Sequence, residues 1–297
     1  MRRVHIISLM TSLVTVSMLA AMPARAATPS SVSGLSASVS GGTISVTGTA
    51  AFGGEDPVQV GDDAVNDNLG GAQTALLGID LDRMLISQPN PNVPTLQFTL
   101  DLNGMTGGGI PEHLAYNWDI RVDGGSVGNG ADWSIKSWRT RALATTVDPY
   151  AAVFTCVPSG TGSSCTAGPQ VPVAYDGTAS EIRISVPMGT IGASPGSTID
   201  AWLRISAPVW VGGTAATQTL AGFYDTATHD QYVVPTKTVR LGIAPTGSPI
   251  SYTATASLSG STFSGSLAVP GPGVYDVGAQ ACFGANCGTG TVTVTIS

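Results

Sequence analysis

The sequence predicts an all-β protein made of an antiparallel β-sandwich with a second, smaller sandwich. Apolar and polar residues alternate over short stretches along most of the chain, and no long stretch shows the 3.6-residue period of a helix. Glycine, serine, threonine, alanine and valine dominate, whereas charged residues make up only 10% of the chain. Short strands joined by tight turns have this composition, and the persistent alternation argues against disorder.

Residues 1–26 have the pattern of an export signal. Two arginines precede a mostly apolar run at residues 6–21, and small residues at 24–26 suit a cleavage site. The run is too short and too rich in serine and threonine for a membrane span. We therefore predict a secreted, extracellular protein with no membrane span after signal cleavage. Cleavage removes three arginines and no acid, so the net charge changes from −7 to −10, which argues against nucleic acid as a partner.

The first elements of the mature chain are two short strands. Leu35–Ser40 and Thr43–Ala51 flank Gly41-Gly42, a pair that favours a tight hairpin turn. An acidic, glycine-rich segment at residues 53–71 then interrupts the alternation. Strands resume at Gly78–Ser87 and at Leu96–Leu102, where every second residue of the latter is apolar and is expected to face a core.

Two aromatic strands are predicted to form the centre of the large sandwich. Between Tyr116 and Val122, aromatic and aliphatic residues take every second position. After a glycine-rich turn, Trp133 shares one face with Ile135, while Lys136 takes the other face together with Trp138. Aromatic side chains bury large areas and pair across strands, which suits a sheet centre. The remaining strands of this sandwich are predicted at Tyr150–Val157, Val171–Tyr175, Glu181–Pro187, Ile199–Ala207, Thr217–Tyr224 and Gln231–Leu241.

The two ends of the chain raise a question of domain organisation. Residues 243–249 look like a linker, and the last 49 residues are too few to bury a core alone, as is the N-terminal hairpin. Pairing the ends would give an immunoglobulin-like sandwich into which the larger one is inserted. The alternative, that the hairpin joins the large sandwich, stays open. The predicted domains are residues 27–54, 55–243 and 244–297. The C-terminal strands are predicted at Ile250–Leu258, Thr262–Val269, Val274–Cys282 and Thr289–Ile296.

The four cysteines form two close pairs, Cys156 with Cys165 and Cys282 with Cys287. Four cysteines allow three connectivities, and local pairing is the simplest of them for an exported chain. Each bridge would then staple a loop between strands. A zinc site is the alternative, but neither pair has the two-residue spacing of zinc knuckles.

The large sandwich resembles a known group of secreted bacterial domains. The resemblance rests on four segments: Asp63 to Asp67, the Asp80-Leu81-Asp82 strand, the alternating strand LQFTLDL and the segment Tyr116-Asn117-Trp118. Over residues 55–243 this order is similar to the DOMON-like β-sandwiches, of jelly-roll type and akin to family 9 carbohydrate-binding modules. The resemblance implies a non-catalytic module that binds sugars or, in some relatives, haem. The tail resembles immunoglobulin- or PKD-like domains of bacterial exoproteins, which implies a spacer or an adhesive unit.

The acidic loop is a candidate calcium site. Asp56, Asp62, Asp63 and Asp67 place four carboxylates in a glycine-rich segment that can turn tightly. Calcium takes six to eight oxygen ligands, so a flexible acidic loop suits it, and extracellular sites can be weak. The spacing of an EF-hand is absent. The alternative is a solvated loop whose Asp and Asn side chains cap turns.

The candidate ligand face lies on the second aromatic strand and just after it. Trp138 with Lys136, Arg139 and Arg141 offers an aromatic plane flanked by hydrogen-bond donors, as stacking on a sugar ring requires. The alternative is that Trp138 packs in a core, the commoner fate of a strand aromatic. Trp202 is expected in the core and Trp210 as a loop anchor.

No set of residues in the sequence defines a reaction. Ser126 lies in a G-x-S-x-G string, but no helix follows it, as a nucleophile elbow requires. We therefore expect a non-enzymatic binding module that takes an extracellular glycan or cell-surface polymer, with a structural calcium ion. The alternatives are a structural or adhesive module without a small ligand and, third, an unrecognised hydrolase.

Overall fold

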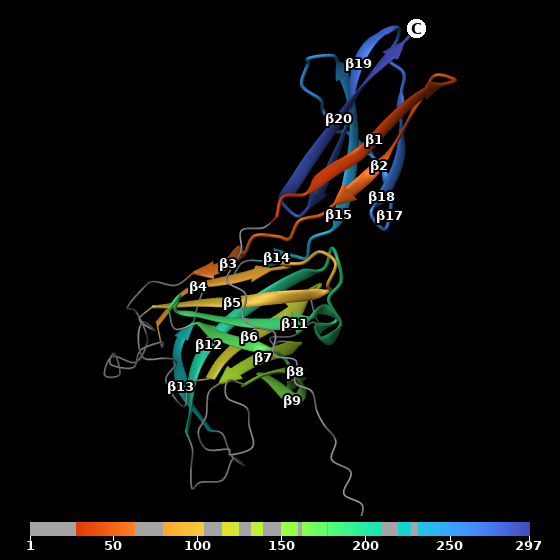
Figure 1. The fold of residues 1–297 in the computed structure, drawn as a ribbon. Coiled ribbons are helices and arrows are strands. Elements are labelled where there is room, and N and C mark those ends of the chain that lie inside the picture. Colours follow the sequence, from red (N-terminus) through yellow and green to blue (C-terminus); the bar gives the residue numbers. More distant parts are fainter. Residues whose placement is uncertain are drawn as a thin grey trace, which may run out of the picture.

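The computed structural model describes residues 28–62, 80–103, 115–124, 132–138, 150–159, 162–176, 178–209, 219–226 and 231–297 (Figure 1). Within these ranges the chain is almost entirely strand, and the one helical element is a four-residue 3₁₀ turn at Met188–Ile191. All strand pairs are antiparallel. The all-β, antiparallel sandwich fold predicted from the alternation is therefore confirmed.

The large sandwich consists of two sheets, which we call B and C. Sheet B has the strand order β10-β11-β5-β4-β3, and sheet C has the order β13-β12-β6-β7-β8-β9, with β14 paired to β12. The strands of sheet B are β3 (Val58–Asp62), β4 (Asp80–Ser87), β5 (Thr95–Asn103), β10 (Val173–Asp176) and β11 (Glu181–Pro187). Those of sheet C are β6 (Ala115–Val122), β7 (Trp133–Trp138), β8 (Tyr150–Ser159), β9 (Gly162–Gln170), β12 (Thr198–Val209), β13 (Thr219–Thr226) and β14 (Gln231–Val233).

The core of the large sandwich lies between the inner faces of sheets B and C. Trp118 of β6 and Phe98 of β5 are fully buried there and meet edge to face, with ring centroids 5.2 Å apart. This geometry is the favoured one for aromatic pairs. The inward faces predicted from the period of two are buried as expected: Leu96, Leu100 and Leu102 on β5, Tyr116 and Ile120 on β6, and Ile182, Ile184 and Val186 on β11.

The small sandwich is assembled from both ends of the chain, so that red and orange strands lie beside blue ones in Figure 1. Strand β2 pairs with β18 over seven residue pairs from Thr262↔Thr49 to Ala268↔Thr43, and Phe263 packs over Gly48, where a β-carbon would clash with the ring. Sheet A has the order β1-β2-β18-β17 and sheet D the order β16-β15-β19-β20. Their strands are β1 (Ser31–Ser40), β2 (Thr43–Ala51), β15 (Lys237–Pro245), β16 (Ala254–Thr255), β17 (Ser257–Ser259), β18 (Thr262–Ala268), β19 (Gly273–Phe283) and β20 (Asn286–Ile296).

The strand expected at Gln231–Leu241 is in fact two strands that belong to different sandwiches. Strand β14 pairs with β12 in sheet C, whereas β15 pairs with β19 in sheet D. Pro235 lies between them and has no N–H with which to continue a ladder. The C-terminal part of the small sandwich therefore begins at about Lys237 and not at residue 244, and residues 243–249 form the end of β15 and a turn rather than a linker.

The junction between the sandwiches is held by side chains on the chain crossings. Asn286, at the start of β20, donates to the Gly54 carbonyl at 2.7 Å and to the Thr28 carbonyl at 2.9 Å. Glu55, only 9% exposed, accepts hydrogen bonds from the Tyr232 hydroxyl and from the backbone N–H of Gln88. Burial raises the pKa of Glu55, and these two hydrogen bonds oppose the shift. In the described ranges, the hydrogen bonds of this buried acid come from residues of the large sandwich and not from a cation.

Candidate ligand-binding face

The outer face of sheet C, opposite the core, carries rings and charged groups on four adjacent strands. The positions follow from the alternation: because Trp118 and Ile120 of β6 point into the core, Asn117 and Asp119 point away from it. Register then places Lys136 opposite Asn117. We call this surface the aromatic–polar face, and it comprises Asn117, Asp119, Arg121, Ser134, Lys136, Phe154 and Trp202.

Three polar residues of this face are shielded from solvent although they are not part of the core. Asn117 is 6% exposed, Asp119 8% and Ser134 1%. Ala152, the partner of Lys136 on β8, is fully buried without belonging to the core cluster. Buried polar groups need hydrogen-bond partners, and the Ser134 hydroxyl accordingly donates to the Asp119 carboxylate at 2.8 Å across the β6–β7 pair.

Two cations of the face lie over aromatic rings. The Arg121 guanidinium lies over the Trp202 ring at 4.9 Å, joining β6 to β12, and the Lys136 ammonium lies over the Phe154 ring at 4.5 Å, joining β7 to β8. Each contact gains electrostatic attraction from the ring quadrupole, on the order of 0.5–2 kcal/mol. Each contact thereby joins the side chains of two neighbouring strands.

Lys136 is the one cation of this face that has no polar partner within the described part of the chain; its contact there is the Phe154 ring. Burial lowers the pKa of Lys136, because desolvation disfavours the ammonium form. The residue as a whole is only partly buried. A polar partner supplied by a ligand would fit this position.

No family model, curated protein or solved structure matches this chain. The resemblance to DOMON-like sandwiches therefore stays a prediction. No helix in the described ranges is both long enough and apolar enough to cross a membrane.

The sequence identified only part of this face. Lys136 lies on the outer face as predicted. Trp138 ends β7 opposite Ala115 and Tyr150, but its side chain lies outside what the structure describes, as do Arg139 and Arg141. The predictions for these three residues stay untested.

The prediction for Trp202 is wrong. Trp202 lies opposite Asp119 on the outer face, while its neighbours Ala201 and Leu203 enter the core. The alternation of Ile199, Ala201 and Leu203 was the signal that could have placed it correctly. Three members of the face were not predicted as ligand-binding residues: Arg121, Asp119 and Phe154. Their place on one surface with Lys136 follows from the pairing of their strands, which the sequence does not reveal. Trp210 lies outside the described residues.

The acidic residues proposed for calcium are only partly described. Asp56 precedes β3 and Asp62 ends it, and both are exposed, while Asp63 and Asp67 lie outside the described residues. Across the described ranges, no three His, Cys, Asp or Glu side chains gather as a metal site would require. Ser126 and all three histidines also lie outside the part of the chain that is described.

Both local disulfides predicted from cysteine spacing are present. Cys156 bonds to Cys165, its direct partner across β8 and β9, and Cys282 bonds to Cys287, its direct partner across β19 and β20. The zinc alternative is thereby wrong for these four residues, because no free cysteine remains. The first bridge lies at the edge of sheet C, two residues beyond Phe154.

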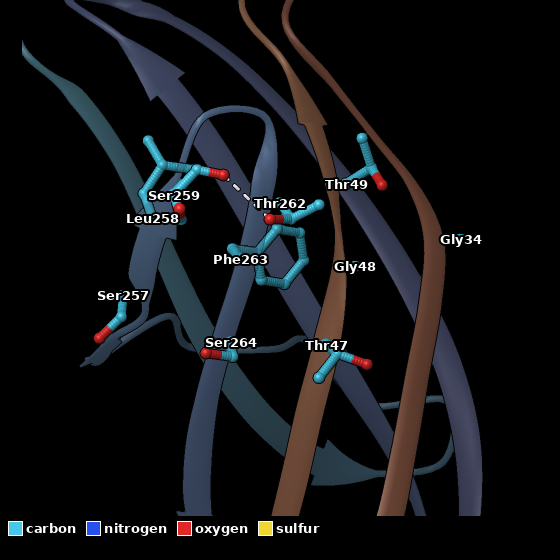
Figure 2. A pocket seen from close by; sticks show the side chains of 10 residues that line it. All are labelled: Gly34, Thr47, Gly48, Thr49, Ser257, Leu258, Ser259, Thr262, Phe263 and Ser264. Carbon is cyan, nitrogen blue, oxygen red and sulfur yellow. Dashed lines mark hydrogen bonds between the residues drawn. The ribbon is translucent and has the colours of Figure 1, made fainter.

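A hollow lies on sheet A of the small sandwich and has a volume of about 480 Å³ (Figure 2). Of its ten lining residues none is charged, and the ring of Phe263 is only 3% exposed because it packs over Gly48. Hydroxyl groups make up its polar lining: Thr47, Thr49, Ser257, Ser259, Thr262 and Ser264. This hollow has no charged lining residue, whereas the aromatic–polar face carries two cations, an acid and two partly exposed rings, so the latter is the stronger candidate.

Proposed function

We propose that this protein is a secreted, non-catalytic binding module that holds a carbohydrate on the aromatic–polar face. The observation that carries the proposal is the gathering of two rings, two cations, an acid and an amide on one shielded surface outside the core. Binding sites combine apolar and aromatic surface with a few placed polar groups. This surface has that composition.

The polar groups of the face suit sugar hydroxyls. A hydroxyl both donates and accepts, so it is satisfied by a mixed set of partners. The Asp119 carboxylate accepts, the Asn117 amide does both, and the ammonium of Lys136 donates. The rings of Trp202 and Phe154 add the apolar contact that a pyranose ring makes through its C–H groups.

Affinity gel electrophoresis against a panel of soluble polysaccharides tests the proposal. At least one polymer should retard the protein, and Asp119→Asn should weaken that binding about tenfold, the effect of one hydrogen bond to a charged group. Asp101→Asn is a matched control, because Asp101 is equally buried, at 8% exposure, on the outer face of sheet B. If no polymer retards the wild type, or if both variants bind alike, the proposal is wrong.

Calcium remains a separate proposal for the acidic loop. It is supported by the exposure of Asp56 and Asp62 at the two ends of β3, with Asp63 and Asp67 following in the sequence. A bound ion would stabilise the folded state by mass action. The melting temperature should therefore rise with millimolar calcium and fall again with EDTA; an unchanged melting temperature would contradict the proposal.

The small sandwich is proposed as a structural companion of the binding domain. The outward residues of sheet A are exposed serines and threonines without charge, in cross-strand rows such as Ser36, Thr47 and Ser264. Asn286 holds it to the chain crossing at Gly54, and Lys237 of β15 donates a hydrogen bond to Asn92 of the large sandwich. A spacer needs such an anchored, uncharged surface and no recognition site of its own.

A further inference from the structure

The cations on the two outer faces of the large sandwich differ in what neutralises them. On sheet B, the Arg83 guanidinium lies 2.6 Å from the Asp101 carboxylate and 3.4 Å from that of Asp82. Arg183 on the same face forms an ion pair with Glu181. Each of these arginines has an acid of the protein beside it, so this face has no need of an outside anion.

Lys136 on sheet C has no such acid. Its strand partners are Asn117 on β6 and Ala152 on β8, both uncharged. Asp119, the nearest acid by register, lies opposite Ser134 and accepts a hydrogen bond from its hydroxyl. The ammonium rests over the Phe154 ring and makes no hydrogen bond or ion pair with any residue that the structure describes.

A partly desolvated ammonium without an anion is costly to maintain. The contact with the Phe154 ring offsets part of this desolvation cost, but a charge-assisted hydrogen bond to an anion would offset more of it. A lysine can normally avoid this cost by extending its flexible stem into water. Here the strand partners of Lys136, Asn117 and Ala152, are both buried, and the ammonium lies over the Phe154 ring.

We propose that the glycan bound on the aromatic–polar face is acidic, its sugar rings carrying a carboxylate or sulfate group that pairs with Lys136. This inference rests on the proposed function and names the class of its ligand. The anion would give the Lys136 ammonium the charged partner that no described residue supplies.

Of the two cations that the structure describes on this face, only Lys136 lacks a polar partner among the described residues, which limits which anion fits. Nucleic acids and other dense polyanions bind proteins through clusters of basic residues that neutralise several phosphates. This chain has 12 basic residues against 19 acidic ones, so its net charge repels such polymers at long range. One lysine beside hydrogen-bonding groups and rings instead suits one anionic group on a sugar.

Two pairs of polymers with matched backbones test the inference with the full mature chain. Polygalacturonate is compared with its methyl ester, which removes the carboxylate charge, and dextran sulfate is compared with dextran. At least one charged polymer should bind about tenfold more tightly than its neutral counterpart, because the charged hydrogen bond is lost in the latter. This preference should fall as sodium chloride is raised, since salt screens the exposed part of the pair.

Substitutions at Lys136 test whether this residue is responsible for the preference for charged over neutral polymers. Lys136→Met keeps the length of the side chain over Phe154 and should abolish the preference for the charged polymer, whereas Lys136→Arg should retain most of it. Lys237→Met is the matched control, because Lys237 also lies over a ring, Phe52 at 5.5 Å, but at the domain junction. It should bind like the wild type.

The outcomes separate this inference from the proposed function. If neutral polymers bind as tightly as charged ones, the acidic class is wrong and carbohydrate binding stands. If no polymer binds, both the acidic class of the ligand and carbohydrate binding itself are wrong. If Lys136→Met and Lys237→Met weaken binding equally, Lys136 is not the anion partner. Should Lys136→Met fail to fold, the wild-type comparison of charged and neutral polymers decides alone.

Discussion

The two outer faces of the large sandwich arise from the same strand alternation but treat charge differently. On sheet B, arginines pair with carboxylates, Arg83 with Asp101 on the neighbouring strand and Arg183 with Glu181 on its own strand. On sheet C, the cations lie over aromatic rings, as Lys136 does over Phe154. Both faces carry an acid that is 8% exposed, Asp101 on one and Asp119 on the other.

The comparison shows two ways in which a shielded charge is treated. It can be neutralised by an acid of the protein, as Arg83 is on sheet B, or it can lack such an acid, as Lys136 does on sheet C. In an ion pair within the protein, the two charges already stabilise each other. Removing one member leaves the other shielded and unpaired, which lowers the stability of the folded state. A cation over a ring is only partly compensated, and removing it should relieve the protein rather than harm it. Removing the Lys136 charge on sheet C should therefore raise stability and weaken binding, whereas removing the Arg83 charge on sheet B should lower stability.

The largest expected effect is at the edge of sheet C. Replacing Cys156 and Cys165 with alanine should lower the stability by about 2–3 kcal/mol, the chain-entropy contribution of a short closed loop. Binding on the face should weaken too, because Cys156 follows Phe154 by two residues on β8. Urea denaturation and affinity electrophoresis measure the two effects. The Cys282 and Cys287 double alanine variant is the control, and equal loss of binding there would remove the link to the face.

On sheet B, Arg83→Met should cost about 1–2 kcal/mol at neutral pH, since the Asp101 carboxylate keeps its burial and loses its charged partner. Burial already raises the pKa of Asp101, and Arg83 opposes that shift. The loss should shrink as the pH falls through the raised pKa, because a protonated Asp101 needs no cation. Thermal melts across the pH range measure this, and combining Arg83→Met with Asp101→Asn should recover most of the stability. A loss independent of pH would contradict the account.

At the domain junction, Glu55 is a buried acid whose described hydrogen bonds come from Tyr232 and Gln88 rather than from a cation. Because its pKa is raised, the folded state favours the protonated form, and stability falls as the pH rises through that pKa. Glu55→Gln keeps an acceptor and removes the charge, so it should raise stability by about 1 kcal/mol at pH 7. The gain should vanish below pH 4 in thermal melts. A less stable variant at pH 7 would show that the ionised carboxylate is needed there.

The smallest expected effect is Lys136→Met, a gain of up to about 0.5 kcal/mol at neutral pH, since relief from desolvation slightly exceeds the lost ring contact. The pKa of Lys136 is lowered by burial, so the cost of the ammonium is present at neutral pH and disappears as the pH rises through that lowered pKa. The difference between variant and wild type should therefore narrow above pH 10 in urea denaturation. A clear destabilisation at neutral pH would mean that the cation serves the fold, as Arg83 does.

The sequence predicted the local features of this protein well. Period-two alternation placed Phe98 and Trp118 in the core, and cysteine spacing predicted both disulfides. These features depend on residues that are close along the chain, where strand geometry alone fixes which side chains share a face. The same alternation placed Lys136 on an outer face.

Only the tertiary structure decided which faces and strands come together. It paired β2 with β18, more than two hundred residues apart, and it placed Trp202 beside Arg121 instead of in the core. Alternation defines two sides of a strand but does not say which neighbour covers either side, because register between distant strands is set by packing. The partners of each charge, and hence the contrast between Arg83 and Lys136, follow from that packing.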